Sequence, residues 1–533
     1  MRNFFVTDNM YFRIIISLLS VMSLMFFCIV RLVKIPFETQ QKTDLNGYTV
    51  EINDGRGNIY DCNGEKITGD KTFYYVVFLP CENAIKKYAQ ITYGEERMEG
   101  LKKLKDKKAV FIKSEKEILG SGIYSYKSAE RYSADLGLEH IVGYTDSNFK
   151  GIYGLEKAYN SILSANGCTE LYFQTSASGD FLLGTEPKVT KQKSKGDLYL
   201  TIDKNIQKIC NNAAEMLKMG AILVTESSTG KIRGMVSKPG FDINNLNAYV
   251  NSKEAPFLNR VLNAYSVGSV FKPLIAAAML ETSKADFTCN CVGYSDILGI
   301  RFYCNNRNGH GVMNLNNAIV NSCNTYFYNA AAKVDPDVFA ELSAVLGFGK
   351  KIKIADNISS VGGSFTSLSE LEKSKANVAN FSIGQGNIAL SPLALCNLYS
   401  AIANGGYYYT PELVDGYTEN GSYYKTQKQS KKYVFSETTA YVLKEYLINT
   451  VETGTGKNAK PEVGGAGGKT ATAQTGRYSN KKEILNAWFC GFYPAKVPKY
   501  VIIILSEQAE SGSVDSAPIF KEITEQIGML INS

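Results

Sequence analysis

A serine and a lysine spaced three residues apart could form a nucleophile with its own base. The segment is Ser269-Val270-Phe271-Lys272. On a helix these two side chains share a face, so the amine can reach the hydroxyl. Gly268 precedes the serine, and an apolar run from Leu274 to Leu280 follows. The expected chemistry is acyl transfer through Ser269, with Lys272 taking the proton.

The spacing alone has little specificity, because the chain contains three other Ser-x-x-Lys pairs that we expect to be accidental matches on the surface. These pairs are Ser228/Lys231, Ser422/Lys425 and Ser479/Lys482. The context of Ser269 differs from theirs. Pro273 removes an N–H near the helix start, and a buried helix start offers free N–H groups and a positive dipole to an oxyanion. A lysine beside a mostly apolar helix is costly unless it has a function.

Two further segments supply polar groups. Ser322-Cys323-Asn324 lies in NSCNTYFYNAA, a predicted loop-to-helix junction. Ser164-Ala165-Asn166 matches the same pattern, and local capping is the structural alternative. Lys469-Thr470-Ala471-Thr472 follows a glycine-rich stretch and is predicted to be a strand lining a cleft. The alternative is a flexible loop followed by a solvated strand.

The elements that must position these groups begin with an apolar N-terminal stretch. Ile14 to Val30 has no charge, and Leu32 and Val33 extend it. A bilayer core requires about 20 residues, with about 17 the lower limit. A signal peptide would have a shorter apolar region and a small-residue cleavage site, which RLVKIPFETQ lacks. The sequence predicts an uncleaved single-pass anchor, and the flanking charges do not set its orientation.

Composition limits the remaining possibilities. The chain has 533 residues, 44% hydrophobic and 20% charged, which indicates about three or four globular units. A net charge of +7 over this length is too weak to indicate nucleic-acid binding. Two histidines exclude multi-histidine metal sites. Eleven cysteines are far fewer than a disulfide scaffold would contain.

The hydrophobic patterns favour an α+β fold. Residues 197–202 alternate like a strand, and Asp203 is a good cap for a helix reaching about Met219. Residues 221–237 are predicted to form a hairpin, with strands near 487–494 and 500–507 and a final helix at 519–531. This order suggests an antiparallel sheet with helices packed on it.

One group of cysteines leaves alternatives open. Cys289, Cys291 and Cys304 with His310 could form a Cys₃His zinc site, although a Cys-x-Cys start lacks the usual spacing. A Cys291–Cys304 disulfide is another option, and the sequence does not fix the pairing. We expect a structural His310, a space-filling Cys323, and a catalytic site without metal or cofactor.

The three segments, in this order, match the signature of penicillin-binding proteins and β-lactamases. The chain resembles a class B penicillin-binding protein, a monofunctional peptidoglycan D,D-transpeptidase. RGNIYDCNG at 56–64 and GIYGLEKAYNSIL at 151–163 resemble segments of that family's pedestal domain, which a β-lactamase lacks. Ala471 replaces the family's usual glycine; we expect activity to survive, although acylation or the fit of β-lactams could change.

The resemblance implies a cytoplasmic tail at 1–13, a transmembrane helix at 14–33, an elongated pedestal at 34–192 and a penicillin-binding/β-lactamase-like transpeptidase domain at 193–533. The catalytic residues that it implies are Ser269, Lys272, Ser322 and Lys469. The substrate-binding residues that it implies are Asn324, Thr470 and Thr472. Backbone N–H groups of Ser269 and Thr472 would form the oxyanion hole. For Lys272 to act as a base, burial and a second cation must lower its pKa.

The implied substrate is a stem peptide ending in D-Ala-D-Ala, with β-lactams as mimics. The implied setting is a single-pass membrane protein with an extracytoplasmic catalytic domain and a SEDS-type glycosyltransferase as partner. One alternative is a D,D-carboxypeptidase or β-lactamase-type hydrolase, in which water replaces the acceptor amine. The other is a β-lactam-binding scaffold or sensor. The sequence does not distinguish division, elongation and sporulation.

Overall fold

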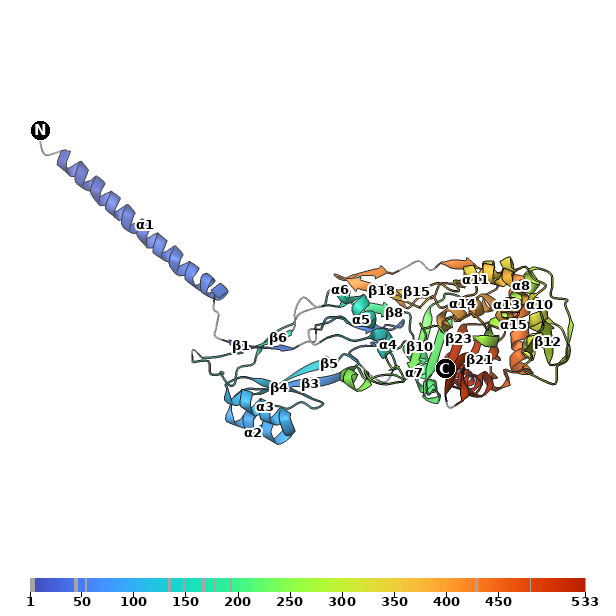
Figure 1. The fold of residues 1–533 in the computed structure, drawn as a ribbon. Coiled ribbons are helices and arrows are strands. Elements are labelled where there is room, and N and C mark those ends of the chain that lie inside the picture. The colour runs from blue at the N-terminus through green and yellow to red at the C-terminus, as the bar shows by residue number, and fades with distance from the viewer. Residues whose placement is uncertain are drawn as a thin grey trace. The chain divides into compact units, whose positions relative to one another are not determined.

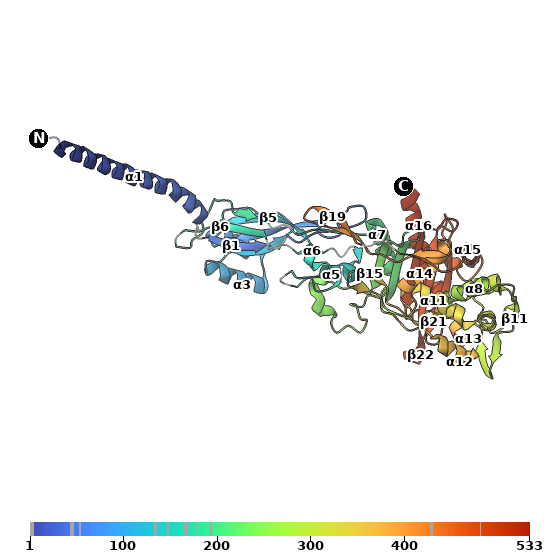
Figure 2. The same cartoon turned by 90° about the horizontal axis from the view of Figure 1, so that it is seen from above.

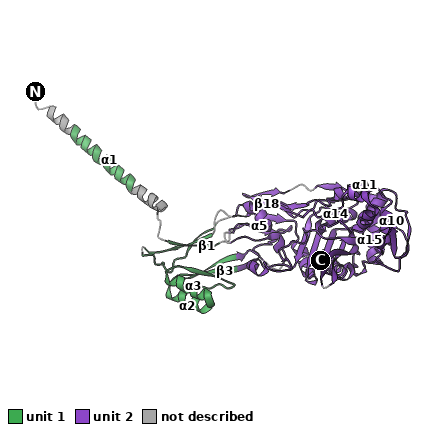
Figure 3. Cartoon of the chain, viewed as in Figure 1, with its two compact units in different colours: residues 1–52, 73–128, 168–191 green, residues 53–72, 129–167, 192–533 purple. Residues whose placement is uncertain are grey.

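The computed structural model describes residues 5–42, 47–52, 55–132, 136–146, 149–164, 169–176, 178–191, 194–426, 430–479 and 481–532. The chain forms two compact units (Figure 3). Unit 1 comprises residues 1–52, 73–128 and 168–191, and unit 2 comprises 53–72, 129–167 and 192–533. The segment predicted as one pedestal, 34–192, is therefore divided between the units.

The division follows from pairing within unit 2. β2 (Ile59–Tyr60) pairs in parallel with β8 (Leu198–Leu200), far along the chain. Arg56 donates through Nε to the Glu156 carboxylate at 2.6 Å, which joins the two pedestal-like motifs. Arg131 donates to the same carboxylate at 2.5 Å. The carboxylate contacts join 53–72 to 129–167, and the β2–β8 pairing joins them to the C-terminal part of the chain.

The N-terminal helix α1 spans Phe5–Lys42. Its segment Phe12–Arg31 has a mean hydropathy of 2.4, and its side chains are exposed. Within the described residues this is the helix whose length and composition allow it to cross a membrane. The predicted apolar helix is confirmed.

Besides α1, the described part of unit 1 contains two three-stranded sheets and two further helices. The first sheet has the order β1 (Gly47–Ile52), β6 (Thr169–Gln174), β7 (Lys188–Thr190), and the second has the order β4 (Val110–Ser114), β3 (Lys71–Phe78), β5 (Ile123–Glu130). The helices are α2 (Glu82–Ile91) and α3 (Gly94–Lys105). Alternation along β3 sends Val76 and Phe78 into one core and Val77 into another.

Unit 2 is built around a five-stranded antiparallel sheet (Figure 1). Its strand order is β10 (Ile232–Lys238), β9 (Gly220–Glu226), β23 (Tyr500–Glu507), β22 (Lys482–Tyr493), β21 (Gly467–Ser479). The predicted hairpin and the two late strands are confirmed. β21 lies at the edge of this sheet, so one of its sides is not paired with another strand of the sheet.

Helices cover both faces of this sheet, as strand alternation requires (Figures 1 and 2; the C-terminal helix is labelled in Figure 2). Ile222 and Ile502 belong to the core that contains α7 (Lys204–Ala213) and α16 (Ala517–Asn532). Leu223 and Ile503 belong to the larger core with α8 (Lys272–Glu281) and α14 (Pro392–Ala403). Each such buried side chain contributes about 1.5–3 kcal/mol.

The remaining helices of unit 2 are α4 (Glu139–Val142), α5 (Gly154–Ala158), α6 (Asn160–Leu163), α9 (Leu315–Val320), α10 (Asn324–Ala331), α11 (Pro336–Leu346), α12 (Leu368–Lys373), α13 (Lys375–Ser382) and α15 (Glu437–Glu452). Small antiparallel pairs are β11 (Cys289–Cys291) with β14 (Gly311–Met313), β12 (Tyr294–Ile297) with β13 (Ile300–Tyr303), β15 (Lys353–Ala355) with β16 (Ile358–Ser359), and β17 (Tyr407–Tyr409) with β20 (Lys431–Tyr433). β18 (Val414–Glu419) joins β8 to β19 (Ser422–Lys425).

Asp203 caps α7 as predicted, because its carboxylate accepts the N–H groups of Asn205 and Ile206. The α-helix nevertheless ends at Ala213, and a short 3₁₀ turn follows, so the predicted end near Met219 was too late. The rest of that segment leads into β9, whose first residues are fully buried in the sheet.

Candidate active site

Ser269 lies in a 3₁₀ turn, Gly268–Phe271, that leads directly into α8. Pro273 occupies the first turn of α8, as the sequence predicted. Gly268 has a φ of +61°, and a Cβ there would lie 3.2 Å from the Cβ of Ala473 on β21. Glycine therefore allows the left-handed backbone and the close approach together. Ser269 itself is half-buried at this contact between helix start and edge strand.

Hydrogen bonds from two distant segments hold this turn. The Gly268 N–H donates to the Gly384 carbonyl at 3.0 Å, and the Tyr399 hydroxyl donates to the Val270 carbonyl at 3.0 Å. Tyr399 is fully buried within α14. The turn that carries Ser269 is thus fixed by the core and not by its own short sequence.

The Lys272 amine connects the first predicted motif to the second. The amine donates to the Ser322 carbonyl at 2.7 Å, to the Ser322 hydroxyl at 3.1 Å and to the Asn324 side-chain oxygen at 2.7 Å. The Phe327 ring centroid lies 5.3 Å from the amine, within cation–π range. Lys272 is fully buried, so every group that can stabilise its charge comes from the protein.

Burial lowers the pKa of Lys272 to about 7, whereas the nearby Cys323 and Cys304 act in the opposite direction. At neutral pH about half of the molecules then hold a neutral amine. The sequence argument required burial and a second cation to lower this pKa. Burial is the main cause in the structure, and Lys272 can serve as a base without a full charge next to it.

The third motif lies on β21, where alternation separates its side chains. Lys469 is buried, and its amine donates to the Thr470 carbonyl at 3.0 Å. Burial, and then the charge of Lys272, hold the pKa of Lys469 well below its usual value. The Thr470 hydroxyl donates to the Thr455 hydroxyl oxygen at 3.0 Å, and the Thr472 hydroxyl oxygen accepts from the Gly512 N–H at 3.4 Å.

Ala471, the departure from the family's glycine, faces the turn that carries the serine. It is buried, and a Cβ built on Gly268 would lie 3.5 Å from its methyl group. Lys469 and Ala473 share this face of the strand by alternation. The extra methyl group is therefore packed beneath Gly268 and is not on the face that carries Thr470 and Thr472.

The predicted residues thus differ in how closely the structure groups them. Lys272, Ser322 and Asn324 are directly hydrogen-bonded, and Lys469 is near enough for Lys272 to affect its pKa. The Ser269 hydroxyl makes no hydrogen bond within the described part of the chain, and Thr470 and Thr472 bond to neighbours outside the predicted set.

Apart from the half-buried Lys231, the members of the competing Ser-x-x-Lys pairs have the exposed positions expected for accidental matches. Ser228 is exposed, and Lys231 forms an ion pair with Asp415 at 2.7 Å. The members of the other two pairs, Ser422, Lys425, Ser479 and Lys482, are all exposed. Asn166 of the competing Ser-x-Asn match lies outside the described residues.

Sequence reasoning missed two side chains at the site. Thr455 bonds to Thr470, and Phe327 lies beside the Lys272 amine. Thr455 occurs in GTGKNA, whose family-like order could have indicated it. Phe327 carries no comparable signal, because its place depends on how α10 packs against α8.

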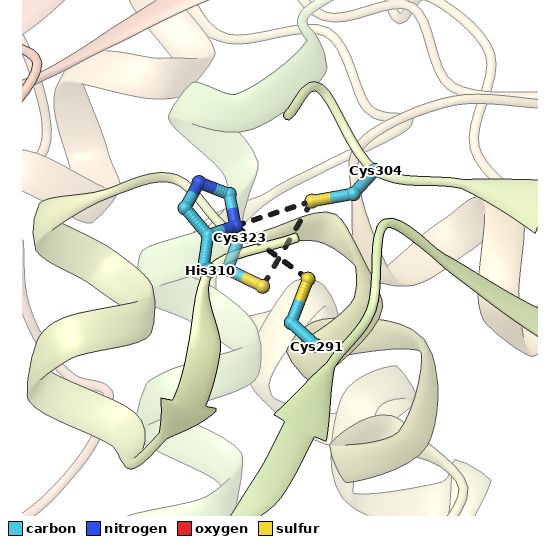
Figure 4. A group of neighbouring side chains, drawn as sticks. All are labelled: Cys291, Cys304, His310 and Cys323. Atoms are coloured by element: carbon cyan, nitrogen blue, oxygen red, sulfur yellow. Dashed lines mark hydrogen bonds between the residues drawn. The ribbon is translucent and has the colours of Figure 1, made fainter. Parts of the chain in front are cut away.

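A group that could hold a metal ion adjoins the site (Figure 4). Cys291, Cys304, His310 and Cys323 place their ligand atoms within 4.8 Å of one another. The sequence proposal of Cys289 as a ligand was wrong, because Cys289 precedes Cys291 by two residues on the short strand β11 and lies outside the group. Cys323, expected to fill space, is fully buried and also places its sulfur in this group. Both Cys291 and Cys304 are free thiols, so the structure does not contain the disulfide considered from sequence.

Comparison with known proteins identifies this architecture. The model of the penicillin-binding protein transpeptidase domain matches residues 220–525, more than half of the chain. The chain belongs to this family. Stage V sporulation protein D of Bacillus subtilis is 29% identical over 88% of this chain and 77% of its own length. The peptidoglycan D,D-transpeptidase MrdA of Haemophilus influenzae is 25% identical over 96% of this chain and 90% of its own.

Solved structures agree with the fold. The D,D-transpeptidase domain of a peptidoglycan glycosyltransferase from Eggerthella lenta superposes with a TM-score of 0.67 at 22% identity, covering 90% of this chain and 99% of that one. The predicted α+β fold and the resemblance to class B penicillin-binding proteins are confirmed. The matches to relatives extend beyond the transpeptidase domain of this penicillin-binding protein into its N-terminal part.

Proposed function

We propose that this penicillin-binding protein is a serine-type peptidoglycan D,D-transpeptidase that uses Ser269 as its nucleophile. The observation that carries the proposal is the buried amine of Lys272, whose pKa is lowered to about 7 and which is hydrogen-bonded to Ser322 and Asn324. A buried lysine poised between its two protonation states is suited to move a proton. Its position, three residues after Ser269, supports that serine as the group it activates.

In the proposed acylation, the Ser269 oxygen attacks the carbonyl carbon of the penultimate D-Ala, and the Lys272 amine takes the hydroxyl proton. The oxyanion is stabilised by the backbone N–H groups of Ser269 and Thr472. The peptide bond then breaks. The terminal D-Ala leaves with a proton that passes from Lys272 through the Ser322 hydroxyl, 3.1 Å from the amine. The product is an ester between the donor stem and Ser269.

In the proposed transfer, an amine of a neighbouring stem attacks the ester carbonyl, and a new amide bond forms. The amine loses a proton to Lys272, and Ser269 recovers one as its ester bond breaks. Lys469, with the hydroxyls of Thr470 and Thr472, binds the terminal carboxylate of the donor. Asn324 holds the substrate amide.

The edge position of β21 supports this assignment of the donor site. A peptide can add to the unpaired side of an edge strand through main-chain hydrogen bonds. Thr470 and Thr472 belong to this strand, and Thr472 is exposed. A β-lactam, which presents an acyl group and a carboxylate like the donor stem, acylates Ser269 in the same way.

The setting follows from the apolar helix Phe12–Arg31, which fits a single-pass anchor. Because stem peptides are joined outside the cytoplasmic membrane, we place residues 1–13 in the cytoplasm and the catalytic domain on the outer side. We propose that the pedestal lies within residues 34–192, which contribute to both compact units. A SEDS-type membrane glycosyltransferase, which would supply uncross-linked glycan strands, is the proposed partner of the anchor and pedestal.

The test compares Ser269→Ala with Ser228→Ala in the full-length protein, using a fluorescent penicillin and then nascent peptidoglycan with D-Ala-D-Ala stems. Ser269→Ala should abolish covalent labelling, while the exposed-pair control Ser228→Ala should label normally. The unaltered protein should release D-Ala and form cross-linked dimers. D-Ala release without dimers would favour a carboxypeptidase, and persistent labelling of Ser269→Ala would refute the nucleophile assignment.

A further inference from the structure

Three thiols and one imidazole converge from separate elements onto one point beside the active site (Figure 4). Cys291 ends β11, and Cys304 follows β13. His310 immediately precedes β14, and Cys323 is the residue before α10. The three cysteines are buried and His310 is half-buried, so water reaches few of these groups.

Three of the six distances between these ligand atoms match the edges of a tetrahedron around a zinc ion, and all six are within 4.8 Å. Zinc lies about 2.3 Å from sulfur and about 2.0–2.1 Å from nitrogen, so ideal edges are about 3.8 Å between sulfurs and about 3.5 Å between sulfur and nitrogen. The His310 Nδ1 atom lies 3.6 Å from the Cys291 sulfur and 3.5 Å from the Cys304 sulfur. The sulfurs of Cys304 and Cys323 lie 3.9 Å apart. An ion can occupy the centre with little side-chain movement.

The donor set also indicates the metal. Three sulfurs and one imidazole nitrogen form a closed four-ligand set of the kind that structural zinc sites use. A disulfide would require two sulfurs to approach to about 2.05 Å, and it would leave the third thiol and the imidazole without a role. Convergence of four ligand atoms is accounted for by a metal and not by one cysteine pair.

We propose that Cys291, Cys304, His310 and Cys323 bind a structural Zn²⁺ that holds the Ser322–Asn324 segment in place. Binding would exchange the three thiol protons for one Zn²⁺, leaving three thiolates and a neutral imidazole on the ion. Cys323 lies between the two residues that accept hydrogen bonds from Lys272, so a bond from its sulfur to the metal fixes both neighbours.

The backbone conformation of Ser322 explains why an additional attachment would stabilise this segment. Ser322 has a φ of +55°, a left-handed conformation that serine rarely adopts. It is held by its own N–H, which donates to the Ile319 carbonyl at 3.2 Å, and by the Cys323 N–H, which donates to the Ala318 carbonyl at 2.9 Å. The metal adds a third attachment through the Cys323 side chain. The positioning role rests on the proposed function; the metal site does not.

The site is tested by metal analysis of the full-length protein, purified in detergent without chelators. We expect about one zinc per chain. Cys291→Ser should lower the zinc content at least about tenfold, while Cys289→Ser, two residues away on the same strand, should leave it unchanged. His310→Asn should lose the metal and His310→Cys should retain it, because Cys₄ is also a zinc ligand set.

A second measurement does not depend on the folding of variants. Zinc is removed from the unaltered protein with a chelator and replaced with Co²⁺, whose visible spectrum reports tetrahedral thiolate coordination. Removal of zinc should slow labelling by fluorescent penicillin, and added zinc should restore it. If zinc removal leaves the rate of penicillin labelling unchanged, the metal does not position the Ser322–Asn324 segment, although the metal site itself remains supported.

Other outcomes overturn the site itself. The metal site would be refuted if the protein contained no stoichiometric metal and gave no Co²⁺–thiolate spectrum. It would also be refuted if Cys289→Ser lost zinc while Cys291→Ser retained it. A disulfide among Cys291, Cys304 and Cys323 in protein isolated without oxidant, detected by mass spectrometry, would also contradict it. Because metal content is measured without substrate, these results are distinguishable from failure of the transpeptidase proposal.

Discussion

The amine of Lys272 lies 3.1 Å from the hydroxyl of Ser322, and both groups are buried. A proton can therefore pass between the first and second motifs without bulk water. The same amine donates to the Asn324 oxygen at 2.7 Å, so the proposed base, the proposed relay and the proposed substrate-binding amide form one network. Changes to any of the three should affect the proton-transfer step before they affect the fold.

The first prediction concerns the pH dependence of acylation. The pKa of Lys272 is lowered to about 7, and only the neutral amine can accept the Ser269 proton. The acylation rate should therefore rise with pH through this pKa and reach a plateau above it. The check is the rate of fluorescent penicillin labelling against pH, with the thermal midpoint measured at each pH as a control. A flat profile across this range would exclude Lys272 as the base.

The second prediction separates the proton relay from local capping. Ser322→Ala removes the hydroxyl 3.1 Å from the Lys272 amine, and labelling should slow by about 10²–10⁴-fold, the range for loss of a proton-transfer group. Ser164→Ala, from the competing Ser-x-Asn match, is the control and should label at the normal rate. Equal rates for the two variants would remove Ser322 from the mechanism.

The third prediction concerns the turn beneath Ser269. Gly268→Ala places a Cβ at a φ of +61°, 3.2 Å from the Ala473 Cβ, and should destabilise the fold by about 1–2 kcal/mol or more while slowing acylation. Gly421 has a φ of +84° with open space around it, so Gly421→Ala should have a similar backbone cost and normal acylation. Thermal unfolding and penicillin labelling measure the two effects separately.

The fourth prediction concerns the departure from the family motif. The Ala471 methyl group is packed against Gly268, away from the face of β21 that carries Thr470 and Thr472. Ala471→Gly should lower the free energy of unfolding by about 1 kcal/mol, because a buried methyl group is lost and glycine weakens a strand. Its labelling rate should stay close to that of the unaltered protein. A large acceleration would show that the methyl group obstructs the acyl group.

The sequence predicted the local features of this site because they depend on short-range patterns. Pro273 after the serine motif, the Asp203 cap and the alternating strand within 197–202 each have a local physical cause, and each is confirmed. Burial of Lys272 could also be anticipated, since the run that follows it is apolar on every face. Its direct bonds to Ser322 and Asn324 could be suggested only by the family's motif order.

What the sequence could not supply depends on contacts between distant segments. The cysteine group illustrates this limit: alternation places Cys289 and Cys291 on the same face of β11, so the sequence could not tell which of them joins the group, and nothing local joins Cys323 to them. Cys323 enters the group because the turn before α10 packs against the loop that contains Cys304. The division of the predicted pedestal has the same origin, since it depends on Arg56 meeting Glu156.

That ion pair provides the last prediction. Glu156 is fully buried and accepts from Arg56 at 2.6 Å and from Arg131 at 2.5 Å. Glu156→Gln removes the charge that compensates both guanidinium groups, which should cost about 3–5 kcal/mol in the free energy of unfolding. Glu82→Gln disrupts an exposed pair with Lys86 and should cost little, because solvent screens that charge. Chemical denaturation of the full-length variants in detergent measures both. Equal stability would mean that the two pedestal-like motifs are joined by packing and not by this carboxylate.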